Sequence, residues 1–152
     1  MEGNPHFSEL LQKLYAHAVE FLIVGGYAVA KYAEPKFTKD LDIWIRNTHE
    51  NAVRVYAALA EFGAPLKSDK LNFEDFTSDD ITYQIGVAPL RVDIMTHIDG
   101  VLFGDAWQRR VKGIMAGVEV NFISPEDLIR NKEASGRPSD LEQLRLLRNK
   151  PL

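Results

Sequence analysis

A pair of glycines, Gly25-Gly26, ends an apolar run and is followed by the acidic string Asp40-Leu41-Asp42. A glycine pair after a strand lets backbone N–H groups approach a phosphate closely, because glycine has no β-carbon. Two acids at alternate positions of a strand project to the same face, where one divalent cation can bind between them. The combination indicates a phosphate-binding turn and a magnesium site on consecutive elements, and therefore chemistry on a nucleoside triphosphate.

The chain has 152 residues, of which 45% are hydrophobic and 26% are charged. This size predicts a single domain over 1–152, with its core at about 20–122 and a C-terminal helical segment at about 124–150. No apolar run approaches the roughly 18 residues that span a bilayer, and the polar start is not a signal peptide. Cysteine is absent, which excludes disulfides, thiolate nucleophiles and cysteine-based zinc sites. We expect a cytoplasmic protein without a membrane partner.

The net charge of −4 is unevenly spread, because the first 103 residues are acidic and the remainder is mildly basic. The basic end of the chain suits an anionic substrate, although such an asymmetry is more often ordinary solvated surface. A broad nucleic-acid groove would need a stronger basic excess.

Hydrophobic periodicity predicts helices and strands in alternation, followed by helices. Helical spacing is found at 7–18, 27–32, 51–62 and 103–111, and strand patterns at 21–24, 40–45, 82–86 and 91–95. A polar, acidic loop is expected over 66–80, and a hairpin interrupted by Gly117 over 114–122. This order predicts an α+β fold in which a small mixed sheet is flanked by helices.

The strand at 40–45 carries an aliphatic residue at every second position. A period of two places Asp40, Asp42 and Trp44 together on the opposite, non-core face. Because Trp44 shares this face, it is either a surface on which a base stacks or, as we expect, a residue packed under the C-terminal helices.

Two helix starts are marked near the C-terminus. Ser124 is a suitable N-cap, with Pro125 at the first helical position. Ser139 and Glu142 have the spacing of a capping box, which predicts a second helix start at Ser139. A turn at 136–138 is expected to join the two helices.

The segment 20–45 resembles the signature of the nucleotidyltransferase superfamily with the DNA polymerase β-like fold. That signature has a hydrophobic strand, a glycine pair, a short helix and then an acid-hydrophobic-acid strand, as in GGYAVAKYAEPKFTKDLDIWI. Its third acid comes from a later strand, and Asp93 within RVDI is the candidate. The resemblance implies the polymerase β palm-like fold.

Further strings resemble bacterial nucleotidyltransferases of the AbiE type, which belong to toxin–antitoxin systems. KFTKDLD resembles the family's R-x-T-x-D-hydrophobic-D, with Lys36 where arginine is usual, and SPEDL, Lys132 and RPSDL resemble its C-terminal motifs. Glu142 or Gln143 replaces a second C-terminal aspartate of the family. The resemblance implies an RNA, tRNA or protein acceptor and a cognate antitoxin or toxin partner.

The implied reaction transfers a nucleoside monophosphate from ATP, GTP or another triphosphate, with two Mg²⁺ or Mn²⁺ ions clamping the reacting oxygens. The implied catalytic and metal-binding residues are Asp40, Asp42 and Asp93, with Asp93 also a general base. The implied nucleotide-binding residues are Gly25, Gly26, Thr38 and Lys132. Arg137 and Asp140 are expected to form a structural ion pair that docks the last helix.

Two alternatives stay open. An aminoglycoside-type nucleotidyltransferase has a similar Gly-Gly-x-Ala opening, and the acidic residues 74–80 would then receive a cationic drug, although a solvated turn is the simpler interpretation. A nucleotide-binding regulatory module without catalysis is the other alternative, against which the retention of all three acids argues. The four histidines lack metal-ligand spacing, and the serines lack a nucleophile-elbow context.

Overall fold

The computed structural model describes residues 5–33, 40–86 and 91–149 and contains a six-stranded mixed sheet. The strands are β1 (Phe21–Val24), β2 (Asp40–Ile45), β3 (Thr82–Ile85), β4 (Arg91–Met95), β5 (Val111–Met115) and β6 (Val118–Phe122), in the order β3-β4-β2-β1-β6-β5. β1 runs parallel to β6 and β2 parallel to β4, whereas the pairs β1–β2, β3–β4 and β5–β6 are antiparallel. The predicted α+β class with a small mixed sheet is confirmed.

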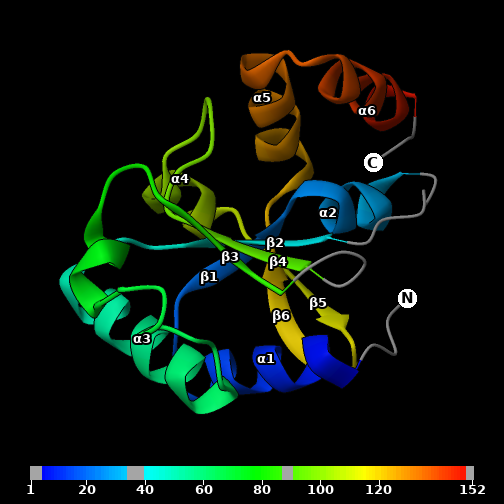
Figure 1. Ribbon diagram of the computed structural model, residues 1–152. Coiled ribbons are helices and arrows are strands. Elements are labelled where there is room, and N and C mark those ends of the chain that lie inside the picture. Colours follow the sequence, from blue (N-terminus) through cyan, green and yellow to red (C-terminus); the bar gives the residue numbers. More distant parts are fainter. Residues whose placement is uncertain (1–4, 34–39, 87–90, 150–152) are drawn as a thin grey trace.

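Helices cover both faces of this sheet (Figure 1). They are α1 (Pro5–Ala16), α2 (Gly25–Tyr32), α3 (His49–Phe62), the 3-10 helix η1 (Phe73–Thr77), α4 (Phe103–Gln108), α5 (Pro125–Ser135) and α6 (Pro138–Arg148). In the view of Figure 1, α1 and α3 lie below the sheet, and α2, α5 and α6 lie above it. In the described part of the chain, no helix combines the length and apolar character that crossing a membrane requires.

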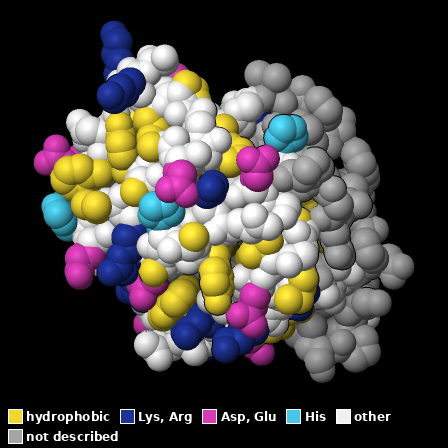
Figure 2. All heavy atoms as spheres, turned by 90° about the horizontal axis from the view of Figure 1, so that it is seen from below, with side chains coloured by type: hydrophobic (Ala, Val, Ile, Leu, Met, Phe, Trp, Pro, Cys, Tyr) yellow, Lys and Arg dark blue, Asp and Glu magenta, His cyan; other side chains and the backbone are white. Residues whose placement is uncertain are grey.

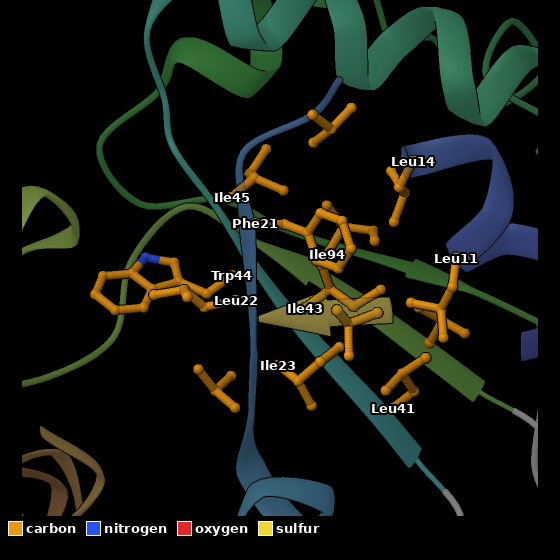
Figure 3. Close-up of a cluster of buried hydrophobic side chains, with 14 of the residues drawn as sticks. Leu11, Leu14, Phe21, Leu22, Ile23, Leu41, Ile43, Trp44, Ile45 and Ile94 are labelled. Atoms are coloured by element: carbon orange, nitrogen blue, oxygen red, sulfur yellow. The ribbon is translucent and has the colours of Figure 1, made fainter. Parts of the chain in front are cut away.

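The central strands are buried on both faces, because their side chains alternate between the two helical layers. Figure 3 shows Leu11 and Leu14 of α1 directed toward Ile43, whereas Leu22 and Trp44 lie on the opposite side of the strands. All five side chains are almost completely buried. The same alternation places Asp42 on the face of Trp44, toward the layer that contains α2.

Trp44 is part of the core rather than a surface for a base. Its side chain is 1% exposed and packs edge to face against Phe103 of α4, with ring centroids 5.0 Å apart. The burial agrees with the prediction that Trp44 is a packed residue rather than a surface for a base, and the ring contact comes from α4. Nothing in the sequence indicates that the short segment carrying Phe103 folds back over β2.

The helix start at Ser124 is confirmed, because its hydroxyl accepts a backbone N–H from the first turn of α5 at 3.1 Å. The predicted capping box at Ser139 is wrong. α6 begins at Pro138, whose fixed φ and missing N–H suit the first helical position. The carboxylate of Asp140 then accepts the backbone N–H of Arg137 at 3.2 Å and closes the start of the helix.

The start of α2, the loop at 66–80 and the β5–β6 turn add detail to what the sequence predicts. α2 begins at Gly25, directly after β1, and the loop 66–80 contains η1. The predicted β5–β6 hairpin is present, and Ala116 and Gly117 at its turn have φ of 51° and 79°. Two positive φ values in succession match the twist of antiparallel strands joined by a tight turn.

The face seen from below in Figure 2 shows acidic and basic side chains interspersed with hydrophobic ones. The described part of this face carries no field of a single sign.

Candidate active site

A cavity of about 410 Å³ opens where the end of β1, β2 and β4 face α5. The sheet contributes acidic side chains, and α5 with the turn that follows it contributes basic ones. The lining residues are Val24, Gly25, Asp42, Thr82, Asp93, Met95, His97, Ile98, Asp99, Asn131, Lys132, Ser135 and Arg137. The cavity therefore brings together residues from both halves of the chain.

Asp42 and Asp93 are register partners on the parallel strands β2 and β4. Neighbouring residues in register project to the same face of a sheet, so the two carboxylates lie side by side in the cavity wall. Burial, and then the charge of Asp93, raise the pKa of Asp42 to about 7, although Lys132 and Arg91 act in the opposite direction. The negative charge of the two adjacent carboxylates is only partly balanced by Lys132 and Arg91, so a bound cation would stabilise the pair.

Gly25 is held against the Asp42 carboxylate by the pairing of β1 with β2, in which Val24 lies opposite Asp42. A β-carbon at Gly25 would lie 2.1 Å from Oδ2 of Asp42, and the φ of Gly25 is +68°. Both the contact and the backbone conformation require glycine. The glycine therefore makes room for the carboxylate, a role that the sequence analysis assigned only to an approaching phosphate.

The third predicted acid, Asp40, is paired with a cation. Its Oδ2 accepts a hydrogen bond from Arg91 at 2.7 Å, and it does not line the cavity. Nε of Arg91 also lies 3.6 Å from Oδ1 of Asp93. The structure thus brings Asp42 and Asp93 together and places Asp40 beside them in an ion pair.

The donor chemistry of this pair fits one Mg²⁺ or Mn²⁺ ion. Among the described residues, no three His, Cys, Asp or Glu side chains are arranged to hold a metal ion. Magnesium, however, is commonly held by one or two carboxylates together with substrate phosphates, so a pair of carboxylates is enough as the protein's contribution of metal ligands. The predicted set of three carboxylates is not preformed, because Arg91 holds Asp40.

Lys132 of α5 extends into the cavity wall. Its side chain is only 7% exposed, and its Nζ lies 3.2 Å from Oδ1 of Asp140. The predicted ion pair between Arg137 and Asp140 is present, with Nε donating to Oδ2 at 2.8 Å. Burial opposes ionisation of Asp140, but the hydrogen bond from Arg137 and the charge of Lys132 hold its pKa below the usual value.

One predicted nucleotide-binding residue, Gly26, is not among the described residues that line the cavity. Gly26 lies in the first turn of α2, and Thr38 lies outside the described residues. The acidic loop considered for drug binding is also not part of the cavity wall, and Asp75 within it accepts the backbone N–H of Asn72 at 2.9 Å. The interpretation of this loop as a surface turn is the one that the structure favours.

Several polar residues of the cavity wall were not predicted from the sequence, among them His97, Asp99 and Asn131. His97 and Asp99 follow β4, with Nε2 of His97 3.2 Å from Oδ1 of Asp99, and Asn131 of α5 donates to the backbone carbonyl of Asp99 at 2.9 Å. His97 has no second histidine at ligand spacing, so histidine spacing gives no signal for it. A useful signal was its place just after the strand of Asp93, since residues that follow such strands often line sites.

A family model described as "Nucleotidyl transferase of unknown function (DUF2204)" matches residues 4–151. A comparison with curated protein sequences finds no match.

Several solved structures share the fold. The lincosamide antibiotic adenylyltransferase LnuA, lincomycin-bound, has a TM-score of 0.59 at 12% identity, and the match covers 96% of each chain. ANT(2'')-Ia in complex with adenylyl-2''-tobramycin has a TM-score of 0.59 at 17% identity, covering 93% of this chain and 84% of that one. A putative nucleotidyltransferase from Thermotoga maritima has a TM-score of 0.56 at 18% identity, covering 91% and 88%. The predicted nucleotidyltransferase fold is confirmed.

Proposed function

The chain belongs to this nucleotidyltransferase family, and we propose that it transfers a nucleoside monophosphate from a nucleoside triphosphate to an acceptor hydroxyl, releasing pyrophosphate. The observation that carries the proposal is the adjacency of Asp42 and Asp93 at the start of α2, with the Lys132 ammonium in the same cavity. Carboxylates that hold a cation and a lysine that holds phosphate are the groups that such a transfer needs.

We assign the triphosphate to the space between α2 and Lys132. The N-terminus of α2 carries partial positive charge and free backbone N–H groups, which favour phosphate oxygens. Lys132 of α5 also lines the cavity and adds a full positive charge. These groups orient the triphosphate and stabilise the negative charge that develops on its oxygens.

Asp42 and Asp93 are the groups that would hold Mg²⁺ or Mn²⁺. Such an ion, when bound, neutralises charge on the transferring phosphate. A second ion, as the family resemblance implies, requires Asp40 to exchange Arg91 for the metal. We therefore propose one site from the present carboxylate pair, and a second that forms on release of Asp40.

Asp93 is also our candidate for the proton acceptor from the attacking hydroxyl. Its side chain is 15% exposed, so it is accessible from the cavity, and Gln84 donates to its Oδ1 at 3.3 Å. A carboxylate within reach of the acceptor hydroxyl favours the oxygen as a nucleophile by taking its proton.

For the acceptor we propose RNA, including tRNA, or a protein, in a toxin–antitoxin setting. The C-terminal strings that resemble AbiE-type proteins support this choice, and so does Lys132, one of their residues, in the cavity wall.

A small cationic acceptor is the second candidate. Asp93 and Asp99 line one wall of the cavity and would attract an amine-bearing molecule. The fold is shared with LnuA bound to lincomycin and with ANT(2'')-Ia bound to adenylylated tobramycin, which adds to this candidate.

One assay separates these acceptors. Each α-labelled triphosphate is incubated with the protein and Mg²⁺ or Mn²⁺, and total tRNA, cell lysate, a lincosamide or an aminoglycoside is offered in parallel. Incorporation of label into one acceptor supports the transfer and identifies the acceptor class. The label should be lost with Asp42→Asn and kept with Asp80→Asn, a variant in an exposed loop. Binding of triphosphate without label in any acceptor contradicts the transfer and favours a regulatory module.

A further inference from the structure

Asp140 is a buried carboxylate that contacts two cations of the cavity wall without lining the cavity itself. It lies on α6 and is 1% exposed. Its Oδ1 is 3.2 Å from Nζ of Lys132, and its Oδ2 accepts from Nε of Arg137 at 2.8 Å. Both Lys132 and Arg137 line the cavity, so one carboxylate on the last helix contacts both basic residues of that wall.

The position of Lys132 depends on this contact. A buried ammonium is strongly disfavoured unless it is paired, and the side chain of Lys132 is almost fully buried. Asp42 lines the same cavity, and the positive charge of Lys132 acts to lower the pKa of that carboxyl. The Lys132 ammonium forms its hydrogen bond with the carboxylate of Asp140 on α6.

We propose that Asp140 is a positioning residue, which fixes the Lys132 ammonium in the cavity wall and so links the docking of α6 to triphosphate binding. The inference rests on the proposed function, in which Lys132 contacts the triphosphate. A lysine has several rotatable bonds, and holding it in one arrangement before the ligand arrives reduces the entropic cost of binding.

The chain contains a matched control in Asp127, a buried carboxylate on the first turn of α5. Asp127 is 0% exposed, accepts from Arg109 at 2.9 and 3.0 Å, and accepts from Arg130 at 2.7 Å. Arg109 and Arg130 line a different cavity, beside Leu102. Asp127 thus resembles Asp140 in being buried and in contacting two cationic side chains. Neither of its cationic partners lines the cavity to which we assign the triphosphate.

The test is a calorimetric Kd for a non-hydrolysable triphosphate analogue with Mg²⁺, measured beside the thermal midpoint of each variant. We expect Asp140→Asn to weaken binding about tenfold, and Asp127→Asn to lower the thermal midpoint while leaving Kd within about twofold. Lys132→Gln and the double variant Asp140→Asn/Lys132→Gln are expected to bind equally weakly, because Asp140 acts through Lys132.

A purely structural Asp140 would give a lower thermal midpoint with an unchanged Kd, which would overturn the inference. If the factors by which the two single substitutions raise Kd multiply in the double variant, the two residues act independently, which would overturn the inference as well. If Asp140→Asn fails to fold, Asp140→Glu keeps the charge and displaces the carboxylate by one methylene. Its Kd is expected to rise about threefold, and an unchanged Kd would again count against positioning.

The outcome for the wild type separates this inference from the proposed function. Binding of the analogue without transfer to any acceptor contradicts the transfer but leaves the positioning role testable by the same Kd values. A wild type that binds no triphosphate analogue contradicts both.

Discussion

The carboxylate of Asp42 lies directly against Gly25, where β1 passes into α2. The antiparallel register of β1 and β2 fixes this contact, and a β-carbon at Gly25 would come within 2.1 Å of Oδ2. The glycine and the acid that first distinguished the sequence are therefore one structural unit, in which each residue restricts what the other can be.

Gly25→Ala is expected to lower the free energy of unfolding and to abolish transfer, because the methyl group displaces Asp42. The backbone strain alone costs about 1 to 2 kcal/mol. Gly117→Ala is the control, since Gly117 has a φ of +79° and open space around the missing β-carbon. Urea unfolding should show the larger loss for Gly25→Ala, and equal losses would mean that the Asp42 contact has no energetic weight.

The stability of the metal-free protein is expected to fall as pH rises. Folding raises the pKa of Asp42 to about 7 from 3.8, so the folded state binds more protons than the unfolded chain between these values. Compared with Asp42→Asn, the wild type should lose roughly 1 to 4 kcal/mol between about pH 4 and about pH 8.

The measurement is urea unfolding of both proteins across this pH range. If the free energy of unfolding depends on pH in the same way in both proteins, the raised pKa of Asp42 is contradicted. Mg²⁺ should stabilise the wild type more at the alkaline end, because a carboxylate ligand must be deprotonated.

The three acids are expected to differ in their effect on transfer. Asp93→Asn should lower kcat by about 10² to 10⁴ as a lost proton acceptor, and Asp42→Asn by at least about 10². Asp40→Asn should have a smaller effect on kcat at saturating metal, because Asp40 contributes only to the proposed second ion and must first leave Arg91. Steady-state kinetics at several metal concentrations test this order, and an Asp40→Asn loss equal to that of Asp42→Asn would show that the two metal sites matter equally for transfer.

A buried asparagine far from the cavity provides a purely structural prediction. The side chain of Asn51 accepts from the backbone N–H of Glu20 at 2.7 Å and donates to the carbonyls of Glu20 and Arg46 at 3.0 and 2.8 Å. Asn51→Ala should cost about 1 to 3 kcal/mol, because the backbone N–H of Glu20 and the carbonyl of Arg46 lose their side-chain partner. The carbonyl of Glu20 keeps the backbone N–H of Arg46 at 3.2 Å. Asn51→Asp should also be destabilising, since a carboxylate cannot donate to two carbonyls.

Chemical denaturation measures both Asn51 variants, with the exposed neighbour Glu50→Ala as the control. The triphosphate Kd should be unchanged in each folded variant, and a large change in Kd would show that this network reaches the cavity.

The sheet was predictable because its strands carry local signals. Strict alternation at 40–45 places Asp42 on the face away from Ile43, and the same argument applied to β4 places Asp93 on a matching face. The start of α5 was predictable because the capping of a helix by Ser124 depends on neighbouring residues only.

The contacts that complete the site were not predictable in the same way. Arg91 binds Asp40 because β2 and β4 are neighbours in the sheet, although they are distant in the sequence. Asp140 reaches Lys132 only because the turn between α5 and α6 folds one helix against the other. No periodicity encodes such pairings, which depend on how whole elements pack.

The position of β1 has a consequence for the biosynthesis of the chain. β1 pairs with β2 on one side, but on its other side Ile23 lies opposite Phe122 of β6. A ribosome must therefore add most of the polypeptide before that apolar strand gains its second neighbour. A nascent or truncated chain that ends before Val118 exposes an apolar strand edge, which makes it a substrate for chaperones or a seed for aggregates.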